Sequence, residues 1–129
     1  MDYFFLELHR KYPETFIVAE DNGEVVGYIM CRIESGLSNF GFGGLIKKGH
    51  IVSVAVLPEF RRKGIGEALV KEALKGMRVY SAKQCFLEVR VTNEPAISAY
   101  KKLGFQTART IRGYYADGED AYVMTAKLE

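Results

Sequence analysis

The chain lacks the features that would place it in several large classes of protein. Its 129 residues contain no apolar run that approaches the length of a membrane span, no internal repeat and no low-complexity segment. The net charge is only +2 and the basic residues form no long run, so the composition gives no reason to expect nucleic-acid binding. The first residues, MDYFFLELHRKY, include acidic residues and no basic leader, so we expect no signal peptide, no membrane partner and a cytoplasmic protein.

Cysteine is also scarce. Cys31 and Cys85 lie far apart in two apolar runs, with a spacing that matches no zinc or redox motif. The sequence alone leaves the possibility of a disulfide between them, but two buried free thiols are the favoured interpretation. Neither cysteine has a neighbour that would lower its thiol pKa, so we do not expect a cysteine nucleophile.

What the chain does have is an ordinary globular composition. With 48% hydrophobic and 26% charged residues, 129 residues are enough to bury the core of a single domain, which we expect to span residues 1–129. Apolar periodicity and turn residues predict the elements in chain order. The first part of the chain should form a short helix at 2–11, a hairpin of strands at 15–20 and 25–33 around Asn22-Gly23, and a mobile glycine-rich loop at 34–49. A strand at 51–57, a helix from 64 to 77, a strand at 84–91, a helix capped by Asn93 and closed by Gly104, and strands at 105–112 and 119–127 should follow. The strands at 51–57 and 84–91 are joined through a helix, so they should run parallel after a right-handed crossover. The predicted fold is therefore of the α/β class, a mixed sheet flanked by helices.

The segment HIVSVAVLPEFRRKGIG, residues 50–66, predicts a strand, a short basic glycine loop and the start of a helix. Unpaired N–H groups at a helix N-terminus attract anions, and glycines let the oxygens of an anion approach the backbone. The junction therefore suits a pyrophosphate, although an ordinary basic helix N-terminus has the same composition. Its spacing R-x-x-G-x-G differs from the dinucleotide fingerprint GxGxxG, and no Gly-Lys-Ser or Gly-Lys-Thr follows as in a Walker loop.

This segment resembles the acetyl-CoA pyrophosphate loop of the GNAT acyltransferases. LEVRVTNEPAISAYKKLGF, residues 87–105, resembles the fifth strand and following helix of the bacterial ribosomal-protein alanine acetyltransferases. GYYADGEDAYVM, residues 113–124, is similar to the C-terminal hairpin of the Ard1-type N-terminal acetyltransferases of archaea and eukaryotes. The resemblance covers residues 15–128. It implies the GNAT fold with its splayed parallel strands, and transfer of the acetyl group of acetyl-CoA to protein N-terminal α-amines by direct attack on the thioester.

The resemblance leaves some points open. GNAT proteins of this type usually have a first strand and a substrate-side helix and loop before the segment that matches Tyr3 and Phe4, so we expect this N-terminal part of the fold to be missing from the sequence. Acetylation of a lysine side chain or of a small-molecule amine is an alternative activity. A catalytically silent module that binds acetyl-CoA is an alternative of another class, and nucleotide binding through a phosphate loop is a more distant one.

The resemblance places acetyl-CoA along the central strand and the loop after it. We expect the pantetheine arm to pair with the strand edge at Val54, Ala55 and Val56, and a backbone N–H of Val54 or Val56 to stabilise the oxyanion. Such stabilisation is often worth about 3 kcal/mol. The other expected contacts are Arg61, Arg62, Lys63, Gly64, Ile65, Gly66 and Glu67 with the diphosphate, and Asn93, Tyr100, Lys101 and Lys102 on the later helix.

The resemblance also implies catalytic candidates. Glu88 matches the general base of the ribosomal-protein acetyltransferases, and His50, in the neighbouring strand, is a second candidate. Instead of a catalytic role, Glu88 could be a solvated strand carboxylate and His50 could be a capping histidine. If the two side chains face each other, they could share a proton-relay water or bind a stray Zn²⁺, but no metal is required. Tyr100 matches the general acid that protonates the CoA sulfur, with a core aromatic residue as the alternative.

The last hairpin carries the expected substrate contacts. Tyr114 and Tyr115 match residues that hold the peptide backbone of the substrate, together with Val54, although they could equally be aromatic residues that cover the sheet edge. The expected partners are protein or peptide N-termini, with ribosomal proteins or nascent chains among them. The preferred first residue, the oligomeric state and the need for a partner subunit are not determined by the sequence.

Overall fold

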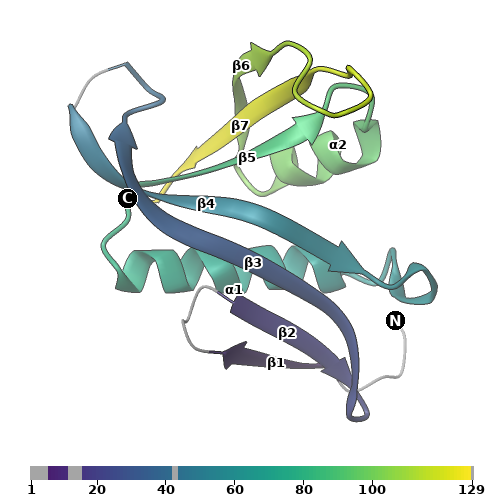
Figure 1. The fold of residues 1–129 in the computed structure, drawn as a ribbon. Helices are drawn as coiled ribbons and strands as arrows, with labels where there is room; N and C mark the ends of the chain where they lie inside the picture. Colours follow the sequence, from purple (N-terminus) through teal and green to yellow (C-terminus); the bar gives the residue numbers. More distant parts are fainter. Residues whose placement is uncertain (1–5, 12–15, 42–43, 129) are drawn as a thin grey trace.

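The computed structural model describes residues 6–11, 16–41 and 44–128 (Figure 1). Strands make up about half of this part of the chain, with one α-helix on each side of strand β5 in the sequence. The elements in chain order are β1 (Leu6–Lys11), β2 (Phe16–Asp21), β3 (Glu24–Leu37), β4 (Leu45–Val56), the 3₁₀ helix η1 (Pro58–Phe60), α1 (Ile65–Val79), β5 (Gln84–Arg90), α2 (Glu94–Lys102), β6 (Gln106–Ile111) and β7 (Ala121–Lys127).

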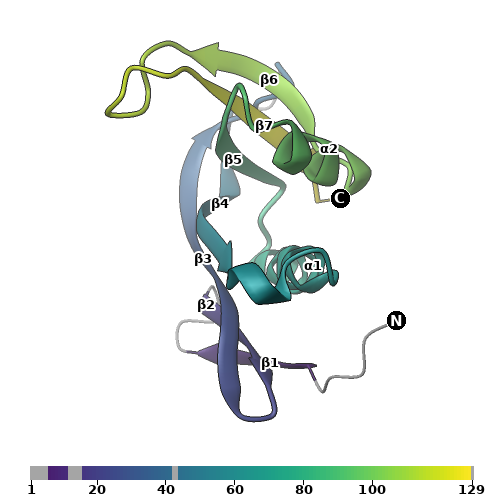
Figure 2. The same ribbon diagram turned by 90° about the vertical axis from the view of Figure 1, so that its right-hand side faces the viewer.

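The described strands form one mixed sheet of seven strands in the order β1-β2-β3-β4-β5-β7-β6. Strands β4 and β5 pair in parallel, and the other neighbouring pairs in this part of the chain are antiparallel. Helices α1 and α2 lie on the same side of the sheet (Figure 2). The predicted mixed sheet with a parallel central pair is therefore confirmed.

The parallel pair separates along its length. Residues 48–51 of β4 pair with residues 84–87 of β5, and within the part of the chain that the structure describes their pairing goes no further, although β4 continues to Val56. Figure 1 shows β5, β7, β6 and α2 leaving one side of this junction while β3 and β4 continue on the other. The splay expected for the GNAT fold is present.

Helix α1 supplies the centre of the core. Its buried residues recur at helical spacing and pack against β2, β3 and β4. They are Ile65, Leu69, Val70, Ala73, Leu74, Gly76 and Met77. Neither α1 nor α2, the α-helices of the described residues, is long and apolar enough to cross a membrane.

Local sequence signals predicted several elements correctly. The hairpin of β2 and β3 turns at Asn22 and Gly23, whose φ angles of 51° and 84° are the left-handed conformation that an Asn-Gly hairpin turn requires. The N-cap of α2 is Asn93, whose side chain accepts a hydrogen bond of 3.4 Å from the Ala96 N–H. Both predictions are confirmed.

The predicted loop at residues 34–49 is wrong over most of its length. Strand β3 continues to Leu37 and β4 begins at Leu45, and these two residues are themselves paired. One glycine there has a packing role, because a Cβ on Gly49 would lie 2.2 Å from the Met77 sulfur of α1. Gly49 lets the helix approach the sheet closely, so it does not indicate a mobile segment.

The predicted N-terminal helix at residues 2–11 is also wrong where it can be compared. Residues 6–11 form β1, which pairs antiparallel with β2, and residues 2–5 lie outside the described residues. The apolar residues Leu6 and Leu8 are two positions apart, which fits the period of a strand as well as it fits part of a helix. Pairing with the edge of β2 supplies the backbone hydrogen bonds that decide between the two.

Candidate active site

A cleft of about 270 Å³ opens where β4 and β5 separate. On the other side of β4, Val54 and Val56 are paired with Ile29 and Gly27 of β3, so the edge toward β5 is the one left for a ligand. An extended chain can add to such an edge as a further strand. The cleft is lined by Ile51, Val52, Ser53, Val54, Leu87, Glu88, Val89, Arg90, Asn93, Ala96, Tyr100 and Tyr115.

The loop after β4 ends in a helix N-terminus suited to an anion. Gly64 is the N-cap of α1 with φ of 81°, and its carbonyl accepts the helical hydrogen bond of Ala68 N–H at 3.0 Å. The N–H groups of the first turn have no acceptor within the helix, and a glycine N-cap has no side chain to offer one. Arg61 and Arg62 are exposed beside them, and Arg61 Nε donates to the Val56 carbonyl at 3.0 Å, which ties the loop to the end of β4.

The two base candidates are in direct contact. Nε2 of His50 lies 2.7 Å from Oε1 of Glu88, and their side chains are only 12% and 14% exposed. The His50 ring stacks on Phe86, with ring centroids 4.2 Å apart and planes inclined by 10°. Stacking and this hydrogen bond together hold the imidazole at the wall of the cleft where Glu88 lies.

The other nitrogen of His50 faces a second carboxylate. Nδ1 lies 3.4 Å from Oε2 of Glu34 on β3, but among the described residues this nitrogen has no hydrogen-bond partner. Glu34 and Glu88 thus approach opposite nitrogens of one ring, so the three groups do not converge on a common point. Within the described part of the chain, no group of three or more His, Cys, Asp or Glu side chains could hold a metal ion.

Tyr100 reaches the cleft from α2. Its ring packs against Phe105 with a centroid distance of 5.7 Å, and burial raises the pKa of its hydroxyl. The hydroxyl is therefore protonated at neutral pH, as a proton donor must be.

Two tyrosines lie in the loop after β6, beside the cleft. Tyr115 lines the cleft, and its ring meets that of Tyr114 edge to face at 5.0 Å. Tyr114 is 47% exposed, so part of it is accessible to a ligand from solution. The guanidinium of Arg90 lies 4.0 Å from the centre of the Tyr115 ring.

The two cysteines do not contribute a nucleophile. Cys31 and Cys85 are buried free thiols, as predicted. Burial raises the pKa of Cys31 to about 12 and raises that of Cys85 as well, so neither forms a thiolate at neutral pH.

Comparison with known proteins agrees with this geometry. Residues 1–105 match the model of the Acetyltransferase (GNAT) family. The chain belongs to the GNAT acetyltransferases. It is 57% identical to an N-alpha-acetyltransferase of Sulfurisphaera tokodaii over 128 residues, which cover 98% of this chain and 77% of that protein.

Solved structures show the same relationship. Ard1 from Thermoplasma volcanium superimposes with a TM-score of 0.76 at 35% identity, covering 92% of this chain and 74% of that one. A chain of the NatB acetyltransferase complex bound to CoA and MES gives a TM-score of 0.78 at 30% identity, covering 92% and 76%. The GNAT fold of this chain is thus shared with proteins that bind CoA.

The structure gathers most of the predicted site of this GNAT chain. Around the cleft it places five predicted residues, Val54, Glu88, Asn93, Tyr100 and Tyr115, with His50 in contact with Glu88. The predicted diphosphate residues form the adjoining N-terminus of α1. Tyr114, Lys101 and Lys102 do not line the cleft, and the two lysines are exposed in the last turn of α2.

Sequence reasoning missed Arg90 and Glu34. Arg90 follows Glu88 by two positions in β5, so strand alternation alone could have placed both on one face. Glu34 was hidden by the incorrect loop at 34–49, since a residue in a loop has no strand register, whereas in β3 Glu34 lies two positions after the residue that pairs with His50.

Proposed function

We infer that residues 1–129 form one domain that transfers the acetyl group of acetyl-CoA to the N-terminal α-amine of proteins. The observation that carries this inference is the cleft between the splayed strands, which has Glu88 on one wall and Tyr100 on another. The cleft connects a strand edge able to bind a pantetheine arm with Tyr115, which contacts Tyr114 and forms with it a pair able to bind a peptide. The reaction is direct attack of the amine on the thioester carbonyl, because both cysteine thiols are buried and neither lines the cleft.

Acetyl-CoA lies along β4 and the start of α1 in this proposal. The pantetheine amides pair with the edge formed by Val54, Ala55 and Val56, and Asn93 adds a hydrogen bond from the opposite wall. The diphosphate accepts hydrogen bonds from backbone N–H groups of the loop and of the first turn of α1, where the helix dipole also favours an anion. The residues proposed for the diphosphate are Arg61, Arg62, Lys63, Gly64, Ile65, Gly66 and Glu67, with Lys101 and Lys102 toward the adenylate.

Protein groups move the two protons of the reaction. Glu88, held by His50, accepts a proton from the incoming amine directly or through water, and the amine nitrogen forms the new bond to the carbonyl carbon. A backbone N–H of Val54 or Val56 stabilises the oxyanion. The carbon–sulfur bond then breaks, and the Tyr100 hydroxyl donates a proton to the departing sulfur.

The substrate is a protein N-terminus. Its backbone carbonyls accept hydrogen bonds from the hydroxyls of Tyr114 and Tyr115, whose pKa values burial raises, so that both remain donors at neutral pH. We include ribosomal proteins and nascent chains among the substrates, which places the reaction in the cytoplasm. The likeness of residues 87–105 to ribosomal-protein alanine acetyltransferases supports this choice.

A peptide panel tests the proposed activity. The protein is incubated with acetyl-CoA and short peptides that begin with Ser, Ala, Met or Glu, and with a peptide that has a blocked N-terminus and an internal lysine. Mass spectrometry should show acetylation of free N-termini and none of the blocked peptide. Acetylation of the blocked peptide alone would favour a lysine acetyltransferase, and binding of acetyl-CoA without turnover of any peptide would favour a silent module.

The diphosphate site is tested by changing Gly64 to alanine. The left-handed φ of Gly64 costs an L-residue about 1–2 kcal/mol. An added Cβ would meet no described atom within 4 Å, so it would project into space open to the proposed diphosphate. We expect the dissociation constant for acetyl-CoA, measured by titration calorimetry, to rise about tenfold, which corresponds to about 1.4 kcal/mol.

Gly23 is a matched control for this change. Its φ of 84° is close to that of Gly64, and an added Cβ there would also meet no described atom within 4 Å. Gly23→Ala should lower the melting temperature about as much as Gly64→Ala, because the backbone strain is the same, but should leave the affinity for acetyl-CoA unchanged. Equal affinities of the two variants would remove the loop from the cofactor site.

A further inference from the structure

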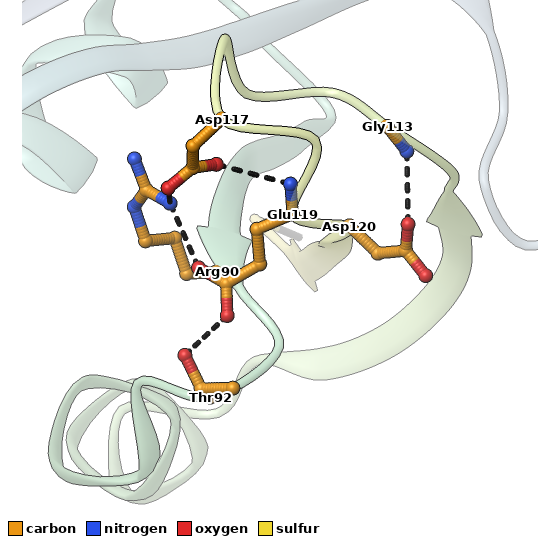
Figure 3. Close-up of polar contacts among 6 residues, drawn as sticks. All are labelled: Arg90, Thr92, Gly113, Asp117, Glu119 and Asp120. Carbon is orange, nitrogen blue, oxygen red and sulfur yellow. Dashed lines mark hydrogen bonds and ion pairs between the residues drawn. The ribbon is translucent and has the colours of Figure 1, made fainter.

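The loop between β6 and β7 is tied to the end of β5 by one arginine (Figure 3). Nη1 of Arg90 donates to Oδ2 of Asp117 at 2.9 Å and to Oε1 of Glu119 at 2.8 Å. The Thr92 hydroxyl donates to the other oxygen of Glu119, so both Glu119 oxygens are held from the β5 side. Arg90 thus joins two acidic residues of the loop to the strand that carries Glu88.

The loop backbone is closed by its own hydrogen bonds. The Gly118 N–H donates to the Tyr115 carbonyl at 2.8 Å, and the Tyr115 N–H donates to the Glu119 carbonyl at 3.1 Å. The Gly113 N–H donates to Oδ1 of Asp120 at 2.8 Å, which holds the point where the loop leaves β6. The backbone on both sides of the tyrosines is therefore fixed in the protein without a substrate.

The arginine also fixes the side chains. Its guanidinium lies over the Tyr115 ring at 4.0 Å, and Tyr115 in turn meets Tyr114 edge to face. The pKa of Glu119 is lowered, first by the Thr92 hydrogen bond and then by Arg90, and that of Asp117 by the Glu119 N–H and by Arg90. Both carboxylates therefore stay charged at neutral pH, and the contacts of Arg90 persist there.

We propose that Arg90 is a positioning residue for the peptide substrate, which holds Tyr115, and through it Tyr114, in the orientation that binds the peptide backbone. This inference rests on the proposed function, which assigns the two tyrosines to the substrate. A loop that is ordered in advance avoids the entropy loss of ordering it on binding, and this saving appears as affinity for the peptide. The loop residues that Arg90 contacts, Asp117, Glu119 and Tyr115, are not among those proposed to bind acetyl-CoA, so the affinity for acetyl-CoA should not depend on these contacts.

Arg90→Gln is the first test. It keeps a polar side chain but loses the guanidinium plane and both charged contacts. We expect the KM for the peptide to rise about tenfold or more, while the KM for acetyl-CoA and the rate at saturating peptide change less than threefold. Arg90→Lys keeps the positive charge but lacks the planar guanidinium, so its peptide KM should lie between those of the unchanged protein and Arg90→Gln. An unchanged peptide KM, or a loss confined to the rate at saturation, would overturn the proposal.

A second variant separates this inference from the proposed function. Tyr115→Ala should also raise the peptide KM, and Arg90→Gln combined with Tyr115→Ala should raise it no further, because Arg90 acts through the tyrosine. An unchanged peptide KM in Tyr115→Ala would refute the substrate role of the hairpin itself. A normal effect of Tyr115→Ala with full additivity in the double variant would refute only the role of Arg90. If Arg90→Gln fails to fold, Glu119→Ala removes one anchor of the arginine and should also raise the peptide KM.

Discussion

Replacing Glu88 with glutamine should lower the single-turnover rate of acetyl transfer about 100-fold or more, since general base catalysis typically contributes factors of that size. Glutamine has the same shape, and its amide oxygen can still accept a hydrogen bond from Nε2 of His50, which lies 2.7 Å from Oε1 of Glu88. What it loses is the ability to take a proton. The dissociation constant for acetyl-CoA should therefore change little, and a rate within a few-fold of the original would remove Glu88 as the base.

Glu34→Gln is the matched control for this change. Glu34 lies 3.4 Å from the other nitrogen of the same imidazole, but it does not line the cleft. The variant removes one negative charge beside His50 and leaves the proposed base in place, so we expect a loss of less than tenfold. Equal losses in the two variants would mean that Glu88 acts through the charge it places near His50 and not as a proton acceptor.

A double variant asks whether His50 and Glu88 act as a unit. If His50 serves to hold Glu88, then His50→Gln lowers the rate, and combining it with Glu88→Gln lowers the rate no further than Glu88→Gln alone. If the two residues act independently, their effects on the activation free energy add. Single-turnover rates are the appropriate readout, because product release can limit kcat in enzymes of this kind.

The parts of the site that could be predicted are those encoded in short segments of sequence. The strand, loop and helix at residues 50–66 and the capped helix after Asn93 each depend on neighbours within a few positions, and both are present. The contact of His50 with Glu88 depends in addition on the parallel pairing of β4 with β5, which brings the two strands together at that level. Local signals therefore predicted the elements that carry the catalytic candidates, whereas the family resemblance named Glu88 and Tyr100 as candidates.

The parts that could not be predicted depend on contacts between distant segments. Gly49 appears in a glycine-rich stretch, and only its pairing with β3 and β5 shows that it belongs to a strand. Glu34 reaches His50 because β3 extends far enough to pair with β4 at that level. Arg90 acquires its proposed positioning role from its hydrogen bonds to Asp117 and Glu119, which lie almost thirty positions later in the sequence. None of these pairings leaves a periodic pattern in the sequence.

Replacing Tyr100 with phenylalanine should also lower the single-turnover rate, by a factor of about 100, the lower end of what general acid catalysis contributes. The ring that packs against Phe105 is retained, so the fold should persist and the melting temperature should change little. Only the hydroxyl that protonates the sulfur is lost. Expulsion of an unprotonated thiolate then limits the collapse of the tetrahedral species, while binding of acetyl-CoA is expected to stay within about threefold of the original value.

Tyr122→Phe controls for the loss of a tyrosine hydroxyl in general. Tyr122 is half-buried on β7 and packs against the core, but it does not line the cleft. Removal of the Tyr122 hydroxyl should leave the single-turnover rate within about twofold of the original value. The decisive comparison uses thioesters of CoA analogues whose thiols are more acidic, since a better leaving group needs less help from an acid. The deficit of Tyr100→Phe should shrink with such a thioester, whereas a deficit that is the same for every leaving group would assign Tyr100 to packing and not to proton transfer.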